Sequence, residues 1–371
     1  MRGFFALRLG AWLFVVASLA SLWATPDLSA SLPAVLQLLA GAALVLILAG
    51  WMEKKRPAGI STTSRLLDAC LLLGFGVLAL TLLGTRWPEY KLSFLSGLYG
   101  ALPSLRSLPL GILSREMSPN QAGGILATFV AFGLAPAFTR SRVSGALLRR
   151  QRIAARALVG AGTVVVFMTG SRAALAGIAA ALLLVTVAAG RRWLWVPGIA
   201  AGTLALASGV DRSVPGHLLG LLIRDETIGT KLVARLDIWS SALNGIQDHA
   251  FTGIGLGVLN EVLPIRYPYE SVGLTYTVTQ AHNIFLDTAL TLGLLGLGAL
   301  VCLLLGMGLS VAQSSGRDAN QKLMAKGVMA ATVVFVVFGM TDSLSLSTPA
   351  SVVLWLWAII LIIVSPSTGE V

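Results

Sequence analysis

Long apolar runs constrain the fold of this chain more than any other feature. Runs of about 17–25 residues match the hydrocarbon thickness of a bilayer, and they recur along all 371 residues. Only 12% of the residues are charged, which is about half the proportion in a soluble domain. The sequence therefore predicts an all-α polytopic membrane protein, with residues 1–371 forming one integral-membrane domain.

Breaks between the apolar runs divide the chain into about ten predicted transmembrane helices. We expect them at 9–25, 33–52, 66–84, 122–139, 157–171, 173–190, 194–210, 284–311, 327–345 and 351–365. The first run follows a basic start and ends in small residues near Ala24, which is also the outline of a secretory signal peptide. Because so many spans follow it, we expect an uncleaved first helix.

Basic residues are concentrated in alternate loops. If the N-terminus lies in the cytoplasm, 17 of the 27 basic residues fall inside, together with only four of the 16 acidic residues. An excess of Lys and Arg in short cytoplasmic loops sets orientation, so the pattern predicts an N-in, C-in topology. The net charge of +11 is then an orientation signal and a contact for anionic lipid. It does not indicate nucleic-acid binding.

Two segments expected outside the cytoplasm are too long to be simple turns. Residues 85–121 contain aromatic and cationic residues suited to the membrane interface. Residues 211–282 form a loop of a length that is usually functional. Within it we expect an amphipathic helix, with Thr230 as its N-cap. Its apolar stripe is predicted to be Leu232, Leu236, Trp239, Leu243 and Ile246.

Several chemistries lack their motifs. The sequence contains no GxxxxGK[ST], no HExxH, and no Asp-x-Asp pair of the kind that holds a metal and a nucleotide sugar. We therefore expect neither a metal site nor a cofactor. The glycines of "TGIGLGV" (253, 255 and 257) lack the spacing and the βαβ context of a dinucleotide loop. They favour a flexible segment that re-enters the membrane.

Two arginines lie where chemistry at the outer face would need them. Arg172, in "TGSRAALAG", stands between two apolar runs. A guanidinium there either snorkels to the interface or faces a cavity, and it suits a lipid-borne phosphate. Arg235 precedes Trp239 on the predicted loop helix, where it is either a solvated charge or a second phosphate contact.

A histidine and an asparagine stand directly before a long apolar run, in "TQAHNIFLDTALTLGLLG". Asn283 suits a helix N-cap. His282 does not, and imidazole titrates near neutrality, as a general base requires. Asp342 and Asn120 also lie at outer ends of spans, where capping or turn formation accounts for them and a supporting role at the site is the alternative.

Four segments occur in an order that resembles the O-antigen ligase and O-antigen polymerase superfamily. They are "SPNQAGGILATFVAFGLAP", "TGSRAALAG", "RLDIWSSALNGIQDHAFTGIGLGVL" and "AHNIFLDTALTLGLLGLGAL". Each is short and leucine-rich, but the ordered set is more specific. The resemblance covers about residues 118–345 and is sharpest over residues 165–300.

The resemblance implies a glycosyltransferase with an integral-membrane fold of the GT-C type in the cytoplasmic (inner) membrane. Its active site would face the periplasm or the exterior. The donor would be a glycan on undecaprenyl diphosphate, and the acceptor a saccharide or lipid core. His282 would be catalytic, Arg172 and Arg235 would bind the diphosphate, and Trp239 would support them. The superfamily's further loop arginine would be Arg224, with Arg212 and Arg266 as alternatives.

The sequence leaves the activity within the superfamily open. An O-antigen ligase and a repeat-unit polymerase share these motifs, with the overall pattern slightly favouring a ligase. A transporter of lipid-linked glycans and a non-catalytic assembly subunit are the hypotheses from other classes. Internal repeats and charges near mid-membrane are typical of transporters, and the sequence shows neither.

Overall fold

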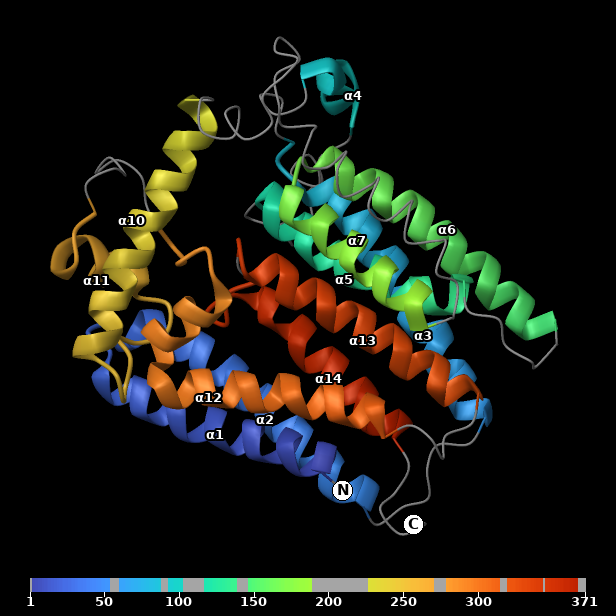
Figure 1. Ribbon diagram of the computed structural model, residues 1–371, viewed down its shortest axis with the longest axis horizontal. Coiled ribbons are helices and arrows are strands. Elements are labelled where there is room, and N and C mark those ends of the chain that lie inside the picture. Colours follow the sequence, from blue (N-terminus) through green and yellow to red (C-terminus); the bar gives the residue numbers. More distant parts are fainter. Residues whose placement is uncertain are drawn as a thin grey trace.

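The fold is a bundle of long apolar helices, seen here in a computed structural model (Figure 1). The structure describes residues 2–53, 60–87, 93–102, 117–138, 146–188, 226–269, 278–313, 319–342 and 344–365. Helices account for nearly all of this part of the chain, and it contains no β-strand beyond an isolated bridge between Thr85 and Met117. The prediction of an all-α fold is confirmed.

The described long helices pack side by side in a bundle. They are α1 (Arg2–Ala24), α2 (Leu28–Glu53), α3 (Ile60–Gly84), α5 (Pro119–Phe138), α6 (Ala146–Met168), α7 (Arg172–Ala188), α12 (Ile284–Ala312), α13 (Ala319–Gly339) and α14 (Val352–Val364). Seven described helices are long and apolar enough to cross a membrane. The segments Arg172–Ala188 and Pro349–Val364 are shorter apolar helices.

The predicted count of about ten spans is thus higher than the seven that the described residues provide. Nine of the predicted spans coincide with helices, two of them short, and the tenth, 194–210, lies outside the described residues. The predicted span 157–171 is too short, because α6 begins at Ala146. Its first three turns carry arginines, whose long side chains let a helix continue beyond the apolar region.

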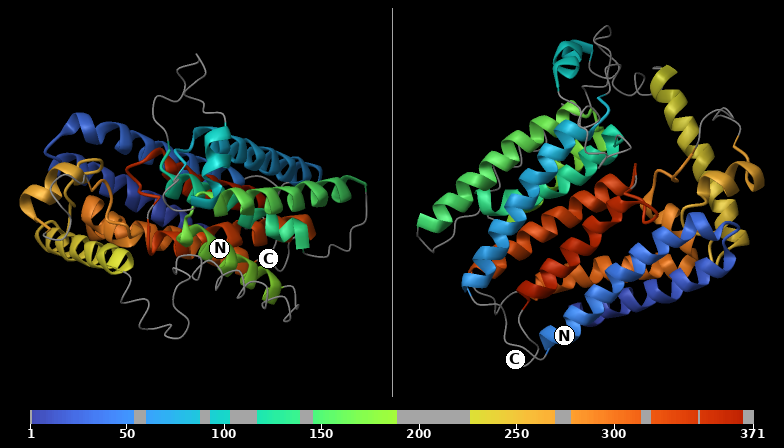
Figure 2. Two further views of the ribbon diagram at one scale, coloured as in Figure 1. Left: turned by 90° about the horizontal axis from the view of Figure 1, so that it is seen from above. Right: turned by 180° about the vertical axis from the view of Figure 1, so that it is seen from behind.

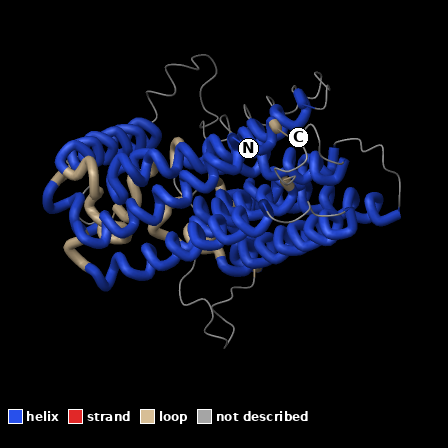
Figure 3. Tube along the Cα trace, turned by 90° about the horizontal axis from the view of Figure 1, so that it is seen from below, coloured by secondary structure: helices blue, strands red, loops and turns tan. Residues whose placement is uncertain are grey.

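The other described α-helices gather at one end of the bundle, which we call the loop end. They are α4 (Ser96–Ala101), α10 (Glu226–Asp248) and α11 (Leu259–Arg266). Figure 2 shows α10 and α11 at this end from behind as well, and Figure 3 shows most of the described loops there. Parts of both predicted outer segments, 85–121 and 211–282, therefore lie at the same end. The predicted N-cap Thr230 is wrong, because α10 begins at Glu226.

The opposite end carries most of the described basic residues, and we call it the basic end. They lie in the first three turns of α1, α3, α6 and α13: Arg2, Arg8, Arg65, Arg149, Arg150, Arg152, Arg156, Lys322 and Lys326. The first described residue, Arg2, and the end of α14 lie at this same end. An N-in, C-in topology requires that arrangement, and the orientation itself stays a prediction.

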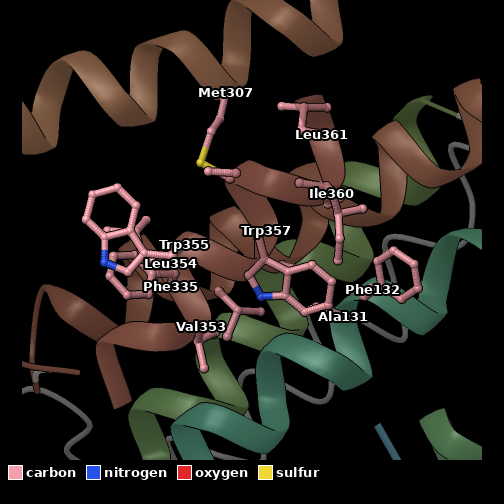
Figure 4. Close-up of a cluster of buried hydrophobic side chains, with 14 of the residues drawn as sticks. Ala131, Phe132, Met307, Phe335, Val353, Leu354, Trp355, Trp357, Ile360 and Leu361 are labelled. Atoms are coloured by element: carbon pink, nitrogen blue, oxygen red, sulfur yellow. The ribbon is translucent and has the colours of Figure 1, made fainter. Parts of the chain in front are cut away.

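Aromatic side chains fill the centre of the bundle (Figure 4). Trp357 of α14 stacks on Phe132 of α5 with ring centroids 5.0 Å apart, and it lies 5.1 Å from Phe129. Trp355 meets Phe14 of α1 edge-on at 5.5 Å. Because α14 is apolar on all sides, it can pack against α2 and α13 as well as against these aromatic rings of α1 and α5. Large apolar side chains on outer helices, such as Phe5, Trp12 and Leu72, remain exposed, as lipid-facing positions should.

Helix α12 is broken at Gly293, close to the loop end. Gly293 has φ +71° and ψ −178°, which interrupts the helical hydrogen bonds. Residues 250–255 replace them: Ile254 N donates to Leu290 O at 2.8 Å, and Leu294 N donates to Ala250 O at 2.7 Å. The glycine-rich segment therefore packs into the break, and its re-entry into the membrane stays a prediction. The first half of α12, Ile284 to Leu292, is a separate short helix.

Candidate active site

His282 lies in the turn that leads into α12, at the loop end. Its imidazole Nδ1 is 3.3 Å from Oδ1 of Asp342, which follows α13. The His282 side chain is 21% exposed and that of Asp342 only 3% exposed. An ionised carboxylate only accepts hydrogen bonds, so Nδ1–H donates and the imidazole lone pair lies on Nε2. This pair has the form of a base oriented by a buried carboxylate.

Two amides complete the surroundings of the Asp342 carboxylate. Asn120 Nδ2, from the first turn of α5, donates to Oδ2 at 2.7 Å. Gln280 Nε2 donates to Oδ1 at 2.9 Å. The predicted residues His282, Asp342 and Asn120 are thus brought together from three helix ends. We call these three residues and Gln280 the His282 cluster.

Asn283 is the N-cap of α12. Its Oδ1 accepts from Phe285 N at 3.0 Å and from Leu286 N at 3.1 Å, and its Nδ2 donates to Met340 O at 3.2 Å. These contacts satisfy the free amides at the helix start and tie α12 to the end of α13. The adjacent His282 and Asn283 therefore have different tasks.

Arg172 is the first residue of α7, with an exposed side chain. The turn before it packs against α5: a Cβ on Gly123 would lie 2.6 Å from Thr169 Oγ1 and 3.3 Å from Ser171 Cβ. Asn120 of the His282 cluster stands one turn earlier on α5. Arg172 therefore lies at the same end as His282, at a helix N-terminus where backbone amides favour an anion.

Trp239 joins α10 to the turn that holds His282. Its indole Nε1–H donates to the carbonyl oxygen of Ala281 at 2.9 Å. Arg235 is half-buried and stands four residues earlier, on the same face of α10. This spacing places Arg235 one turn of α10 before the contact between Trp239 and Ala281. Arg224 and Arg212 lie outside the described residues, and Arg266 is an exposed residue at the end of α11.

The buried face of α10 differs from the predicted stripe. Leu236 and Leu243 are 51% and 49% exposed, whereas Ile238 and Ala242 are buried. Gly245 lets α10 approach α12 closely, because a Cβ added at this position would lie 2.7 Å from Leu290 Cδ1 of α12. The small residues of α10 therefore decide which of its faces packs. The helix itself is confirmed, whereas its buried face, like its N-cap, was predicted wrongly.

A phenol–carboxylate pair also connects α10 to α11. Tyr267 Oη donates to Asp248 Oδ2 at 2.9 Å and so links the ends of α10 and α11. Burial raises the pKa of Tyr267, and the nearby Asp248 carboxylate raises it further. The phenol therefore remains a neutral donor at physiological pH.

Comparison with known families identifies the region that contains these residues. Residues 157–301 match the family model described as O-antigen ligase. The comparison therefore supports the resemblance to the O-antigen ligase superfamily over residues 157–301. A comparison with curated proteins gave no match. The match supports a membrane enzyme of the O-antigen ligase or polymerase type in general terms.

The O-antigen ligase region contains only part of the site. Arg172, Arg235, Trp239 and His282 lie inside residues 157–301. Asp342 and Asn120, which complete the His282 cluster, lie outside it. The matched segment therefore depends on α5 and on the turn after α13 for the surroundings of its histidine.

The sequence analysis overlooked Asp287, Ser345 and Gln280. Asp287 is fully buried in the first turn of α12, and its Oδ2 accepts from Ser345 Oγ at 2.6 Å. An acidic residue inside an apolar span is costly and marks a functional position by default, so "HNIFLD" carried a signal for it. Gln280 gave none. In the described part of the chain, no group of three His, Cys, Asp or Glu residues could hold a metal ion.

Proposed function

We propose that this O-antigen ligase superfamily member transfers a glycan from undecaprenyl diphosphate to the hydroxyl of a saccharide or lipid-core acceptor. Transfer takes place at the loop end, which faces the periplasm or exterior of the cytoplasmic membrane. The observation that carries the proposal is the pair of His282 and the buried Asp342, 3.3 Å apart. A base of that form suits proton removal from a hydroxyl nucleophile.

His282 acts as the general base. The acceptor hydroxyl oxygen attacks the anomeric carbon of the donor and forms the new glycosidic bond. The bond between that carbon and the diphosphate oxygen breaks, and undecaprenyl diphosphate leaves with the bonding electrons. His282 Nε2 takes the hydroxyl proton, while Asp342 stabilises the imidazolium through Nδ1–H. Attack on the side opposite the leaving group inverts the anomeric configuration.

Arginines stabilise the leaving group. Diphosphate develops negative charge as it departs, and fixed cations in a site of low dielectric constant stabilise such charge without a metal ion. The described candidates are Arg172, which lies beside the amides at the start of α7, and Arg235, which lies one turn from the contact between Trp239 and Ala281. Arg224 is the candidate outside the described residues.

Two other activities make different predictions. A repeat-unit polymerase would use a second lipid-linked glycan as the acceptor and would produce a ladder from the donor alone. A ligase, which we favour, needs a separate acceptor and makes one attachment. A transporter would move the lipid-linked glycan across vesicle membranes without forming a covalent product.

The test uses purified protein, a defined undecaprenyl-diphosphate glycan, and reactions with and without acceptor. We expect His282→Ala and Arg172→Ala to lower the transfer rate at least ~100-fold, because each removes a group that acts in the transition state. His249→Ala and Arg65→Ala are matched controls: His249 follows α10 outside the His282 cluster, and Arg65 lies at the basic end. Both controls should keep full activity. Full activity of the His282 or Arg172 variant would overturn the assignment.

A further inference from the structure

His282 holds a backbone conformation that residues with a side chain rarely adopt. Its φ is +52°, in the left-handed region, and no other non-glycine residue in the described part of the chain has a positive φ. Such a conformation is unfavourable for a residue with a Cβ. It persists only where neighbouring contacts impose it, and such positions concentrate at functional sites.

Ala281 is held on both sides by side chains from two different helices. Its N–H donates to Asp287 Oδ1 of α12 at 2.9 Å. Its carbonyl oxygen accepts from Trp239 Nε1 of α10 at 2.9 Å. Ala281 is fully buried, so these two side chains satisfy backbone groups that water cannot reach. We call this pair of contacts the Ala281 clamp.

The clamp acts on the peptide planes that determine the φ of His282. The peptide between Ala281 and His282 contains the carbonyl that Trp239 holds, and rotation of this plane relative to the His282 Cα is the φ angle itself. Asp287 holds the preceding peptide plane. On the other side, Asn283 is fixed as the N-cap of α12. With both neighbours fixed, His282 keeps the left-handed conformation that directs its imidazole to Asp342.

Asp287 is itself held in place. It is 1% exposed, and its second oxygen accepts from Ser345 Oγ, which lies three residues after Asp342. The same short segment after α13 thus contacts the imidazole through Asp342 and the backbone clamp through Ser345. Asp287 lies too deep in this packing to face the solvent, and its carboxylate accepts hydrogen bonds from Ala281 and Ser345.

We propose that Asp287 and Trp239 are positioning residues that hold His282 in its strained, active conformation. The inference rests on the proposed role of His282 as the base. It gives the loop helix α10 a second task besides carrying Arg235, because α10 supplies half of the Ala281 clamp. Neither residue touches the reacting atoms in this scheme, so both act on the rate of transfer through His282.

The first test compares Asp287→Ala with Asp287→Asn. The Ala variant loses both hydrogen bonds. The Asn variant keeps them, because its amide oxygen accepts from Ala281 N–H and its NH2 donates to Ser345 Oγ. We expect Asp287→Ala to lower kcat about 10- to 100-fold with the donor KM unchanged, and Asp287→Asn to keep most of the activity. Loss in the Asn variant equal to that in the Ala variant would mean that charge, not positioning, matters.

Thr288→Val is the matched control. Thr288 is also fully buried in the first half of α12, but its hydroxyl bonds only to Ile284 O of its own helix, at 2.7 Å. Its removal leaves the Ala281 clamp intact, so kcat should stay within about twofold. If Thr288→Val is as slow as Asp287→Ala, general loosening of α12 explains both, and the proposal is overturned.

A second test asks whether the clamp acts only through His282. Free imidazole can replace the missing side chain in His282→Ala, and its position does not depend on the backbone conformation of residue 282. The rescued rates of His282→Ala and of Asp287→Ala/His282→Ala should therefore be equal, and a further loss in the double variant would contradict the proposal.

If Asp287→Ala does not yield folded protein, Trp239→Phe decides instead, because it removes the N–H donor and keeps an aromatic ring. Unchanged kcat in Trp239→Phe would overturn the clamp.

These results separate the two proposals. An active His282→Ala variant contradicts the proposed function. An inactive His282→Ala variant together with fully active Asp287→Ala and Trp239→Phe variants contradicts only the positioning inference.

Discussion

At the scale of single residues, the environment of His282 separates a base from an ordinary surface histidine. Asp342 faces Nδ1 from a buried position and is held there by Asn120 and Gln280. This arrangement favours the tautomer whose lone pair lies on Nε2. Sequence proximity could not show this pairing, because residues 282 and 342 are brought together only by the packing of α12 against α13.

Asp342→Asn tests the charge of this partner. Asn120 can rotate its amide to accept from the new NH2 group, so the asparagine oxygen can still accept from His282 Nδ1–H. The variant keeps the shape but loses the charge that stabilises the imidazolium. We expect kcat to fall about 100-fold with little change in thermal stability, measured by steady-state transfer assays and unfolding in detergent. An unchanged kcat would show that Asp342 only positions the ring.

At the scale of elements, the break in α12 couples the loop to the bundle. Residues 250–255 supply the hydrogen bonds that the helix loses at Gly293. The backbones of the two segments approach each other closely: a Cβ on Gly293 would lie 2.5 Å from Phe251 O, and one on Gly253 would collide with Thr291. The apolar run at 284–311 predicts the helix. It does not predict the interruption, because the sequence does not show which segment inserts there.

Gly293→Ala should separate these two segments. The substitution adds a Cβ at a positive φ and against a backbone oxygen, which together cost about 2–5 kcal/mol. We expect a lower unfolding midpoint in detergent and reduced transfer activity. Gly298→Ala is the control five residues along the same helix, where nothing lies within 4 Å of the added Cβ. It should be neutral or stabilising by up to about 1 kcal/mol, and equal destabilisation by both variants would contradict the role of the break.

At the scale of the whole molecule, charge distinguishes the two ends of the bundle. The basic end holds arginines and lysines of four helices, and the loop end holds the His282 cluster and Arg172. We expect a bundle with this polarity to insert with its basic end in the cytoplasm. That orientation would place the candidate active site where lipid-linked glycans and their acceptors meet outside the cytoplasm.

Cysteine labelling can test the orientation. Ser240 is exposed on α10 at the loop end, and Ala319 is exposed at the start of α13 at the basic end. In right-side-out vesicles, a membrane-impermeant maleimide should label Ser240→Cys at once and Ala319→Cys only after permeabilisation. The native Cys70 and Cys302 lie within apolar helices, buried and half-buried, and should give little background. Labelling in the reverse order would invert the topology.

The amino-acid sequence by itself determined the helical membrane class, the asymmetry of charge, the resemblance to O-antigen ligases and the candidates His282 and Arg172. Apolar length and charge are local properties, which are readable without a fold. Only the tertiary structure decided that Asp342 faces His282, that Asp287 and Trp239 hold Ala281, and that α10 packs through Gly245 and not through its leucines. These depend on close approaches between helices distant in sequence, where small residues and hydrogen-bond geometry outweigh the size of an apolar side chain.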